Sequence, residues 1–486
     1  MRDLWLIGLS FVYIFAVIGI SSLLFRNREG EASRKFVHIM VGNWIFISHW
    51  YENVWAALFV PLVFVVINAL SLKYNLISTM ERKDDSLGTV FYAISLAVAV
   101  GLRFATGWTV FPMIGILIMA YGDGFAALVG KRWGKTHPFA FAPDKTLVGS
   151  AVVAGVGMVV TAASLFVLGD AAILERLGAI GVLWIALLTG LLSAFIEASG
   201  KRGCDNLTLP LGAAMFASLA FYYGNLSFYL YMFASVGILW YGLQRRWLTA
   251  DGVVAAILTA ATLHALGGLW IALSLHAFYL LGSYVSKIRN ERKREAERCQ
   301  EGSGARNWMQ VVCNSLPACI LVWCRYFFAD QAQIFSLLAY GIFAAAAADT
   351  FSSELGMLSR SKVFSILTGR RMRRGVSGGV SWIGLLAGGI GGFMLALLAW
   401  PEFGFRGVLF VTAMGVAGTL IDSVLGALVQ RKYRAADGGF SDKPTRIGEL
   451  PVRGIAWISN NAVNLISLCL VAVIGVVLNH WFGIVS

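Results

Sequence analysis

Long apolar runs dominate this 486-residue sequence, and they limit what the chain can fold into. Most of the runs approach or exceed the roughly 20 residues that an α-helix needs to cross the hydrocarbon core of a bilayer. Inside a bilayer the backbone N–H and C=O groups have no water to bond with, so such segments satisfy them within a helix. The intervening segments are too short for a separate soluble domain. The sequence therefore predicts an all-α, polytopic integral membrane protein.

Composition supports this class. The chain is 58% hydrophobic and only 13% charged, whereas soluble domains carry roughly 25% charged residues. The two short runs at 36–50 and 208–223 also fit re-entrant segments. We expect about sixteen spanning helices, near residues 4–24, 36–50, 53–71, 87–105, 108–129, 146–168, 171–193, 208–223, 225–243, 250–266, 268–285, 311–328, 333–357, 378–400, 405–430 and 455–482.

The distribution of basic residues gives an independent indication of topology. Lys and Arg normally collect in the cytoplasmic loops of a membrane protein. Of the 39 here, all but five fall in alternate connecting segments; the exceptions are Arg2, Arg103, Arg176, Arg325 and Arg406. Both termini are therefore expected on the outer side. The net charge of +13 follows mostly from this topology, with anionic lipids and nucleotide phosphates as partners, and requires no nucleic acid.

The segment "RRWLTADG", around 245–250, separates two stretches of similar length. Each stretch contains its own acidic, glycine-rich set of residues, and no strict internal repeat relates them. The sequence thus predicts two membrane modules, at 1–245 and 250–486. The six cysteines form no C-x-x-C pair, so neither a zinc site nor a disulfide framework is indicated.

In the first module, "YGDGFAALVGKRWGKT" places an aspartate within an apolar helix, followed by a glycine-spaced basic turn. Its ending resembles a phosphate-binding loop, which requires G-x-x-x-x-G-K-[ST] after a strand. The spacing from Gly130 to Gly134 is one residue short, and an apolar helix precedes it, so that reading fails. An aspartate within a spanning helix costs roughly 2.5–3.5 kcal/mol on the insertion scale and is usually retained for function. Asp123 is therefore a candidate site residue.

Further polar residues of this module fall on the same, basic side of the membrane. Carboxylates beside lysines, with glycines that let backbone approach an anion, suit a phosphate and its divalent cation. We expect Asp123, Glu197 and Asp205 to hold Mg²⁺ or activate a hydroxyl, and Lys135 and Lys145 to bind phosphates. Phosphoryl transfer requires mainly such positioning and charge neutralisation. The membrane setting then implies a lipid acceptor.

Four motifs of this module, "RKFVH", "GDGFAALVGKRWGK", "DKTLVGS" and "DNLTLP", resemble those of the polyprenol kinase family, which includes phytol kinase and dolichol kinase. The resemblance covers about residues 30–215 and implies a CTP-using lipid kinase with its site at the cytoplasmic face. The glycine–aspartate core also resembles CDP-diacylglycerol synthase, but that family's C-terminal Lys-Arg, Lys-Asp, His-Gly-Gly signature has no counterpart here. The nucleotide-binding and phosphate-binding residues expected from the motifs are Arg34, Lys35, His38, Gly130, Gly134, Lys135 and Asn206.

The second module also carries carboxylates in apolar helices, at Asp349 and Asp422. Asp422 lies between Gly418 and Gly426 on one helix face, so a ligand or another backbone can approach it there. Asp349 and Glu354 are five residues apart and diverge by about 140° on a regular helix. We expect Asp349 and Asp422 to hold Mg²⁺, with a secondary role for Glu354.

The stretch "RRGVSGGVS" offers an arginine cluster followed by small residues, which is typical of a phosphate-binding nest. Close helix packing is the alternative explanation for its glycines. The phosphate-binding residues expected here are Arg371, Arg373, Arg374, Gly375, Ser377, Gly378, Gly379, Ser423, Asn461 and Asn464. The motifs "ADTFSSELG", "GVSGGVS" and "DSVLGALVQ" resemble the phytyl-phosphate kinase family over roughly 250–480, a family linked to converting prenyl monophosphates to diphosphates.

Together the two resemblances imply a bifunctional isoprenoid-alcohol kinase that converts an alcohol to its monophosphate and then its diphosphate. Phytol or geranylgeraniol is the leading substrate, and CTP (or ATP) with Mg²⁺ the leading donor. The expected location is a bacterial inner membrane, or an organelle envelope or thylakoid membrane, with the sites facing cytoplasm or stroma. Two alternatives remain open: a cytidylyltransferase that forms a CDP-lipid, and a membrane transporter.

Overall fold

The computed structural model describes residues 1–26, 31–74, 87–301, 304–435, 438–446 and 448–485. The fold is helical, which confirms the expected all-α membrane class. Within the described ranges, strands occur only in two small antiparallel hairpins. Strand β1 (Phe364–Ser365) pairs with β2 (Gly379–Val380), and β3 (Tyr433–Arg434) pairs with β4 (Phe440–Ser441).

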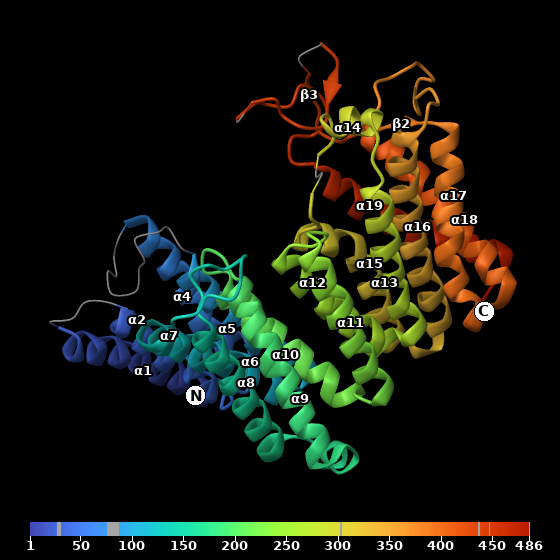
Figure 1. Ribbon diagram of the computed structural model, residues 1–486. Helices are drawn as coiled ribbons and strands as arrows, with labels where there is room; N and C mark the ends of the chain where they lie inside the picture. Colours follow the sequence, from blue (N-terminus) through green and yellow to red (C-terminus); the bar gives the residue numbers. More distant parts are fainter. Residues whose placement is uncertain (27–30, 75–86, 302–303, 436–437, 447, 486) are drawn as a thin grey trace. The chain divides into compact units, whose positions relative to one another are not determined.

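The chain forms two compact units, Met1–Tyr222 and Tyr223–Ser486, each with its own helices (Figure 1). This division precedes the 245–250 segment proposed from the sequence. The reason is that the helix Leu226–Gln244 packs against the helix Ala250–Thr262 of the second unit.

The first unit contains both short and long helices. Its elements are α1 (Arg2–Leu24), α2 (Glu31–Gly42), α3 (Trp44–Ser48), α4 (Val54–Tyr74), α5 (Gly88–Thr106), α6 (Val110–Leu117), the π-helix η2 (Ile118–Asp123), α7 (Gly124–Trp133), α8 (Leu147–Leu168), α9 (Ala171–Ser199) and α10 (Asp205–Tyr223).

Helices α8 and α9 meet through glycines. A Cβ on Gly157 would lie 2.9 Å from the Gly190 Cα, and a Cβ on Gly190 would lie 2.4 Å from the Ala154 carbonyl oxygen. Small residues let two helix backbones approach closely in a bilayer, where dispersion and not hydrophobic burial drives association. This contact fixes the end of α9, which carries Glu197.

The second unit is built around one buried helix, α16. The elements of the unit are α11 (Leu226–Gln244), α12 (Ala250–Thr262), the π-helix η3 (Leu263–Gly267), α13 (Leu269–Lys287), α14 (Glu291–Glu297), α15 (Trp308–Phe327), η4 (Ala329–Gln331), α16 (Ala332–Leu358), α17 (Trp382–Ala396), η5 (Leu397–Ala399), α18 (Trp400–Leu428) and α19 (Asn460–Phe482).

Helix α16 contacts α13, α15, α17, α18 and α19. Its alanine run, 344–348, leaves room for neighbouring backbones. A Cβ on Gly388 would lie 2.9 Å from the Ala348 carbonyl oxygen, and one on Gly418 would lie 2.5 Å from the Ala345 Cβ. The space beside Gly418, which the sequence left open to a ligand or another backbone, is thus filled by α16. At one end of the unit, α14 and both hairpins gather above the helices (Figure 1).

Twelve helices among the described residues are long and apolar enough to cross a membrane, fewer than the sixteen expected. Three expected spans drop out: 36–50 is divided into the short helices α2 and α3, and α10 and α15 are not among the twelve. The expected spans 378–400 and 405–430 correspond to α17 and α18, which pack against each other; the segment Trp382–Leu428, with a non-helical residue at Gly404 (φ 59°), is counted once among the twelve.

Candidate functional site

Asp123 occupies an irregular turn of a buried segment in the first unit. Helices α6, η2 and α7 form one 24-residue span, and its π-helical stretch ends at Asp123. Such π stretches are rare and frequently occur at functional sites. A Cβ on the next residue, Gly124, would lie 2.4 Å from Ile39 Cγ1, so this glycine lets α7 approach α2. The polar residues of α2 are thereby brought to Asp123.

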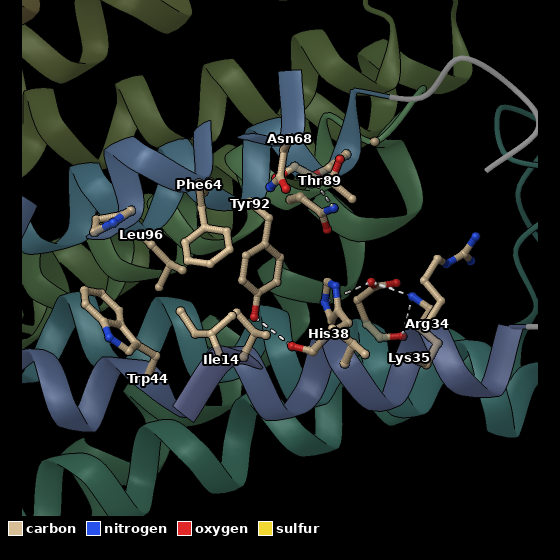
Figure 2. Close-up of a pocket in the computed structure, with 18 of the residues that line it drawn as sticks. Ile14, Arg34, Lys35, His38, Trp44, Phe64, Asn68, Thr89, Tyr92 and Leu96 are labelled. Carbon is tan, nitrogen blue, oxygen red and sulfur yellow. Dashed lines mark hydrogen bonds and ion pairs between the residues drawn. The ribbon is translucent and has the colours of Figure 1, made fainter. Parts of the chain in front are cut away.

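Two residues of α2, Lys35 and His38 (both labelled in Figure 2), contact the Asp123 carboxylate. The Lys35 Nζ lies 2.6 Å from Asp123 Oδ2, and the His38 Nε2 lies 3.4 Å from the same oxygen. The Tyr92 hydroxyl donates to the His38 carbonyl oxygen at 2.8 Å and so ties α5 to α2. A buried charge needs such partners to offset its desolvation. Lys35 and His38, expected as phosphate ligands, therefore hold the carboxylate.

Two further carboxylates join Asp123 from α9 and α10. Glu197 is in the last turn of α9, and Asp205 begins α10. Carboxylate oxygens of the three residues all lie within 4.8 Å of one another. The Lys145 ammonium forms an ion pair with Glu197 and lies 3.9 Å from Asp205 Oδ2. The sequence-predicted residues of three distant motifs thus form one cluster.

The cluster fits a divalent cation. Three carboxylates, at Asp123, Glu197 and Asp205, face two ammonium groups, at Lys35 and Lys145, which leaves one formal negative charge. Hard oxygen ligands of this kind are those that Mg²⁺ prefers. Burial acts to lower the pKa of Lys145, but Glu197 and Asp205 outweigh burial and raise it above its ordinary value. Lys145 is therefore cationic at neutral pH.

Two cavities meet at this cluster. The first is mainly apolar, with one polar end, and is bounded mostly by α1 to α5, with η2 and the start of α10 at its polar end. The second is named the polar cavity after its charged lining residues, among them Lys131, Lys145, Glu197 and Arg202. The two cavities share four lining residues: Lys35, Asp123, Gly203 and Asp205. The carboxylates consequently lie at the boundary between an apolar and a polar compartment.

The remaining predicted residues of this unit are placed differently. Gly130 and Gly134 line the polar cavity, and a Cβ on Gly134 would lie 2.4 Å from the Gly130 carbonyl oxygen. Arg34 and Asn206 line the polar end of the apolar cavity, where Asn206 Nδ2 donates to the Gly88 carbonyl oxygen at 2.9 Å. Lys135 is exposed and lies outside both linings.

The second unit contains a separate polar cavity. It collects carboxylates and amides from α16, α18 and α19 together with the glycine-rich loop that leads into β2. The sequence-predicted residues in its lining are Asp349, Glu354, Arg374, Gly375, Ser377, Gly378, Gly379, Asp422, Ser423, Asn461 and Asn464. The fold thus brings together nearly all the residues expected in this module.

The three acids of this cavity have different surroundings. Asp422 Oδ2 accepts from the Ser467 hydroxyl at 3.3 Å. The Asn464 amide, turned so that its nitrogen donates, places that nitrogen 3.2 Å from the same oxygen. Glu354 pairs at 2.6 Å with Lys293, whose side chain is fully buried. Among the described residues, Asp349 has no hydrogen-bond or ion-pair partner for its carboxylate. Asp349 and Asp422 are therefore less engaged by cationic partners than Glu354, which pairs with Lys293 of α14.

The arginines of this unit depart from the expected phosphate clamp. Arg371 and Arg373 are exposed and lie outside the cavity lining. Arg374 lines the cavity, but its guanidinium donates to the Ser361 carbonyl oxygen at 2.7 Å. Arg306, just before α15, lines the cavity with its guanidinium 5.2 Å from the Phe278 ring centre. No role was expected for Arg306 from the sequence, and this cation became a candidate only through its place in the cavity lining.

Asp442 is a positioning residue that sequence reasoning missed. The backbone N–H of Ser377 donates to Asp442 Oδ2 at 2.8 Å, and the Ser377 hydroxyl donates to the same oxygen. Lys432 donates to the Ser377 carbonyl oxygen. Burial raises the pKa of Asp442 above its ordinary value. These contacts hold the glycine-rich loop at the cavity, and no local pattern around Asp442 marks it in the sequence.

Comparisons with known proteins agree with a membrane enzyme class. Residues 233–472 match the family described as integral membrane protein DUF92. The phytol kinase of Synechocystis is 35% identical over 220 residues, which cover 44% of this chain and 91% of that protein. Protein PGR of Arabidopsis thaliana is 30% identical over 258 residues, covering 47% of this chain and 87% of that protein. No solved structure matches the chain.

Proposed function

We propose, from the premise that this chain belongs to the integral membrane family of the Synechocystis phytol kinase and carries a DUF92 region, that its first unit phosphorylates an isoprenoid alcohol. Phytol or geranylgeraniol is the proposed acceptor, and CTP or ATP the proposed donor. The motifs that resemble polyprenol kinases lie in this unit, at residues 31–210.

One observation carries the proposal: the carboxylate cluster lies where the apolar and polar cavities meet. A prenol is a long apolar chain with one hydroxyl, whereas a nucleoside triphosphate is a polar polyanion. The two substrates need different surroundings and must still meet at one point. Asp123 and Asp205, which line both cavities, are at that point.

The proposed transfer joins the alcohol oxygen to the γ-phosphorus and breaks the bond between that phosphorus and the bridging oxygen of the β-phosphate. The nucleoside diphosphate leaves, and the hydroxyl proton passes to a carboxylate oxygen of the cluster. Asp123, Glu197 and Asp205 would hold Mg²⁺, which neutralises charge on the transferred group. Lys145 faces the polar cavity and contributes a fixed positive charge there.

For the second unit we propose the second phosphorylation, from prenyl monophosphate to diphosphate. Its polar cavity combines the Asp349 and Asp422 carboxylates with Arg306 and the loop from Gly375 to Gly379. Arginine binds phosphate strongly through parallel N–H···O bonds. Oxygen ligands for a cation, a guanidinium and a glycine-rich backbone are parts that a phosphate acceptor and a nucleotide require.

Incubation of the purified protein with γ-labelled CTP or ATP, Mg²⁺ and either phytol or geranylgeraniol tests both proposals. The expected products are labelled monophosphate, then diphosphate, together with nucleoside diphosphate, and EDTA stops their formation. Release of pyrophosphate would instead identify a cytidylyltransferase. Uptake of prenol or phosphate into vesicles without nucleotide turnover would identify a transporter.

A further inference from the structure

One end of the apolar cavity of the first unit is lined by a buried aromatic residue. We infer that Trp44 sets the longest isoprenoid chain that this unit accepts; the inference rests on the kinase function proposed above. Figure 2 shows Trp44 at one end of the cavity and Arg34 and Lys35 at the other, with Phe64 and Leu96 between them.

The α2–α3 segment forms one wall of this cavity along its length. Lys35, His38, Val41 and Trp44 recur every three residues and all line the cavity. Asn43, between the two helices, has φ −66° and ψ −13°, so the helical path continues nearly unbroken. At 1.5 Å of rise per residue, the path from Lys35 to Trp44 measures about 13 Å. The polar end and the aromatic end are thus held apart by a rigid element.

The position of the reacting hydroxyl fixes the direction of the chain. Its oxygen must reach the carboxylates at Asp123 and Asp205, which line the polar end. The hydrocarbon tail then points toward Trp44, whose side chain is 1% exposed. Buried apolar residues, including Ile14, Val60 and Leu96, line the path between the two ends. A chain longer than the cavity therefore meets the indole ring.

The indole is suited to substitution. Its Nε1 is buried and has no hydrogen-bond partner among the described residues. Replacing an unpartnered buried donor by an apolar ring leaves no polar group unsatisfied, so Trp44→Phe should fold normally. Trp44→Leu and Trp44→Ala open progressively more space. Trp55, on α4, is 75% exposed and lies outside the lining, so Trp55→Ala is a matched control.

The test compares kcat/KM of the full-length enzyme and these variants for farnesol, geranylgeraniol, phytol and a longer polyprenol. We expect the ratio for the longest alcohol over farnesol to rise about tenfold or more in Trp44→Ala, because each methylene in an apolar pocket changes discrimination by roughly tenfold or more. Trp44→Phe and Trp44→Leu should give intermediate ratios, and Trp55→Ala the wild-type ratio.

Two failures are distinguishable. If the wild-type protein phosphorylates several prenols and all three Trp44 variants keep its chain-length profile, the inference is overturned and the kinase function stands. If the wild-type protein phosphorylates no prenol, the proposed function is overturned together with the inference. Reading the ratio in Trp44→Phe protects the test against a folding defect in Trp44→Ala.

Discussion

The two units each place carboxylates beside a polar cavity, but they differ in what adjoins it. In the first unit, a largely apolar cavity shares Asp123 and Asp205 with the polar one, and two lysines pair with the carboxylates. In the second unit, the cavity lining is polar, and Lys293 forms an ion pair with Glu354. The first arrangement suits an apolar alcohol and the second a phosphate. The contrast suggests two successive steps with different acceptors.

The largest effect should come from Asp123→Asn, which keeps the shape but removes the charge of the shared carboxylate. We expect phosphorylation of the alcohol to fall by roughly 10²–10³-fold, the loss typical for one preorganised electrostatic group. Prenyl monophosphate supplied externally should still become diphosphate. Asp170→Asn, at the exposed start of α9, is the control. Loss of both activities in a folded protein would mean that the units share one site.

Asp422→Asn is the converse change and should affect only the second step. The variant should accumulate monophosphate, with diphosphate formation lowered by about 10²-fold if the carboxylate holds Mg²⁺. Product analysis of a time course with labelled nucleotide measures both steps at once. Diphosphate formation within a few-fold of wild type would make Asp422 structural and move the second site toward Asp349 and Glu354.

Lys145 and Lys135, the two lysines expected to bind phosphates, allow a comparison within the first unit. Lys145→Gln removes the cation that faces Glu197 and Asp205, and the first step should slow by roughly ten- to a hundredfold, as expected for a charged contact of about 1.5–3 kcal/mol. Lys135→Gln, at an exposed position outside the cavities, should change the rate by at most a few-fold. Equal losses in the two variants would contradict the assignment.

The smallest expected effect concerns the arginines of the second unit. Arg306→Gln should raise the KM for prenyl monophosphate, lowering kcat/KM by about tenfold, since one charge-assisted contact is lost. Arg371→Gln serves as the control, because Arg371 is exposed and outside the lining. A larger loss at Arg371 than at Arg306 would restore the arginine cluster of the glycine-rich loop as the phosphate clamp.

The contrast also shows what could be predicted from the sequence. A carboxylate in an apolar helix is costly to insert, so Asp123, Asp349 and Asp422 stand out against their surroundings. Helices of about 20 apolar residues stand out for the same reason. The structure brings Asp123 together with Glu197, and Asp349 into one cavity with Asp422. These residues could be selected without knowing how the helices pack.

Tertiary contacts decided the rest. Lys35 was expected to bind phosphate, but the close approach of α2 and α7 at Gly124 places its ammonium on Asp123. Arg306 and not Arg371 lines the second cavity, and Asp442, distant in sequence, holds the glycine-rich loop there through Ser377. Such contacts join residues far apart in the chain, and no local pattern encodes them.

The same reason explains the pocket and the helix count. Trp44 lies in a run that was expected to span the membrane, and only the fold shows it facing a cavity. The same run, 36–50, is divided at Asn43 into α2 and α3, so the expected span there is absent from the helix count.

Co-reconstitution of Asp123→Asn and Asp422→Asn proteins in one bilayer, supplied with geranylgeraniol and labelled nucleotide, tests the central claim of two separable sites most directly. Alone, the first variant should form almost no labelled prenyl phosphate and the second only monophosphate. Together they should form diphosphate, because monophosphate released by one protein reaches the intact second unit of the other. A mixture that makes no more diphosphate than the separate variants, from proteins that bind and fold as wild type does, would contradict the account.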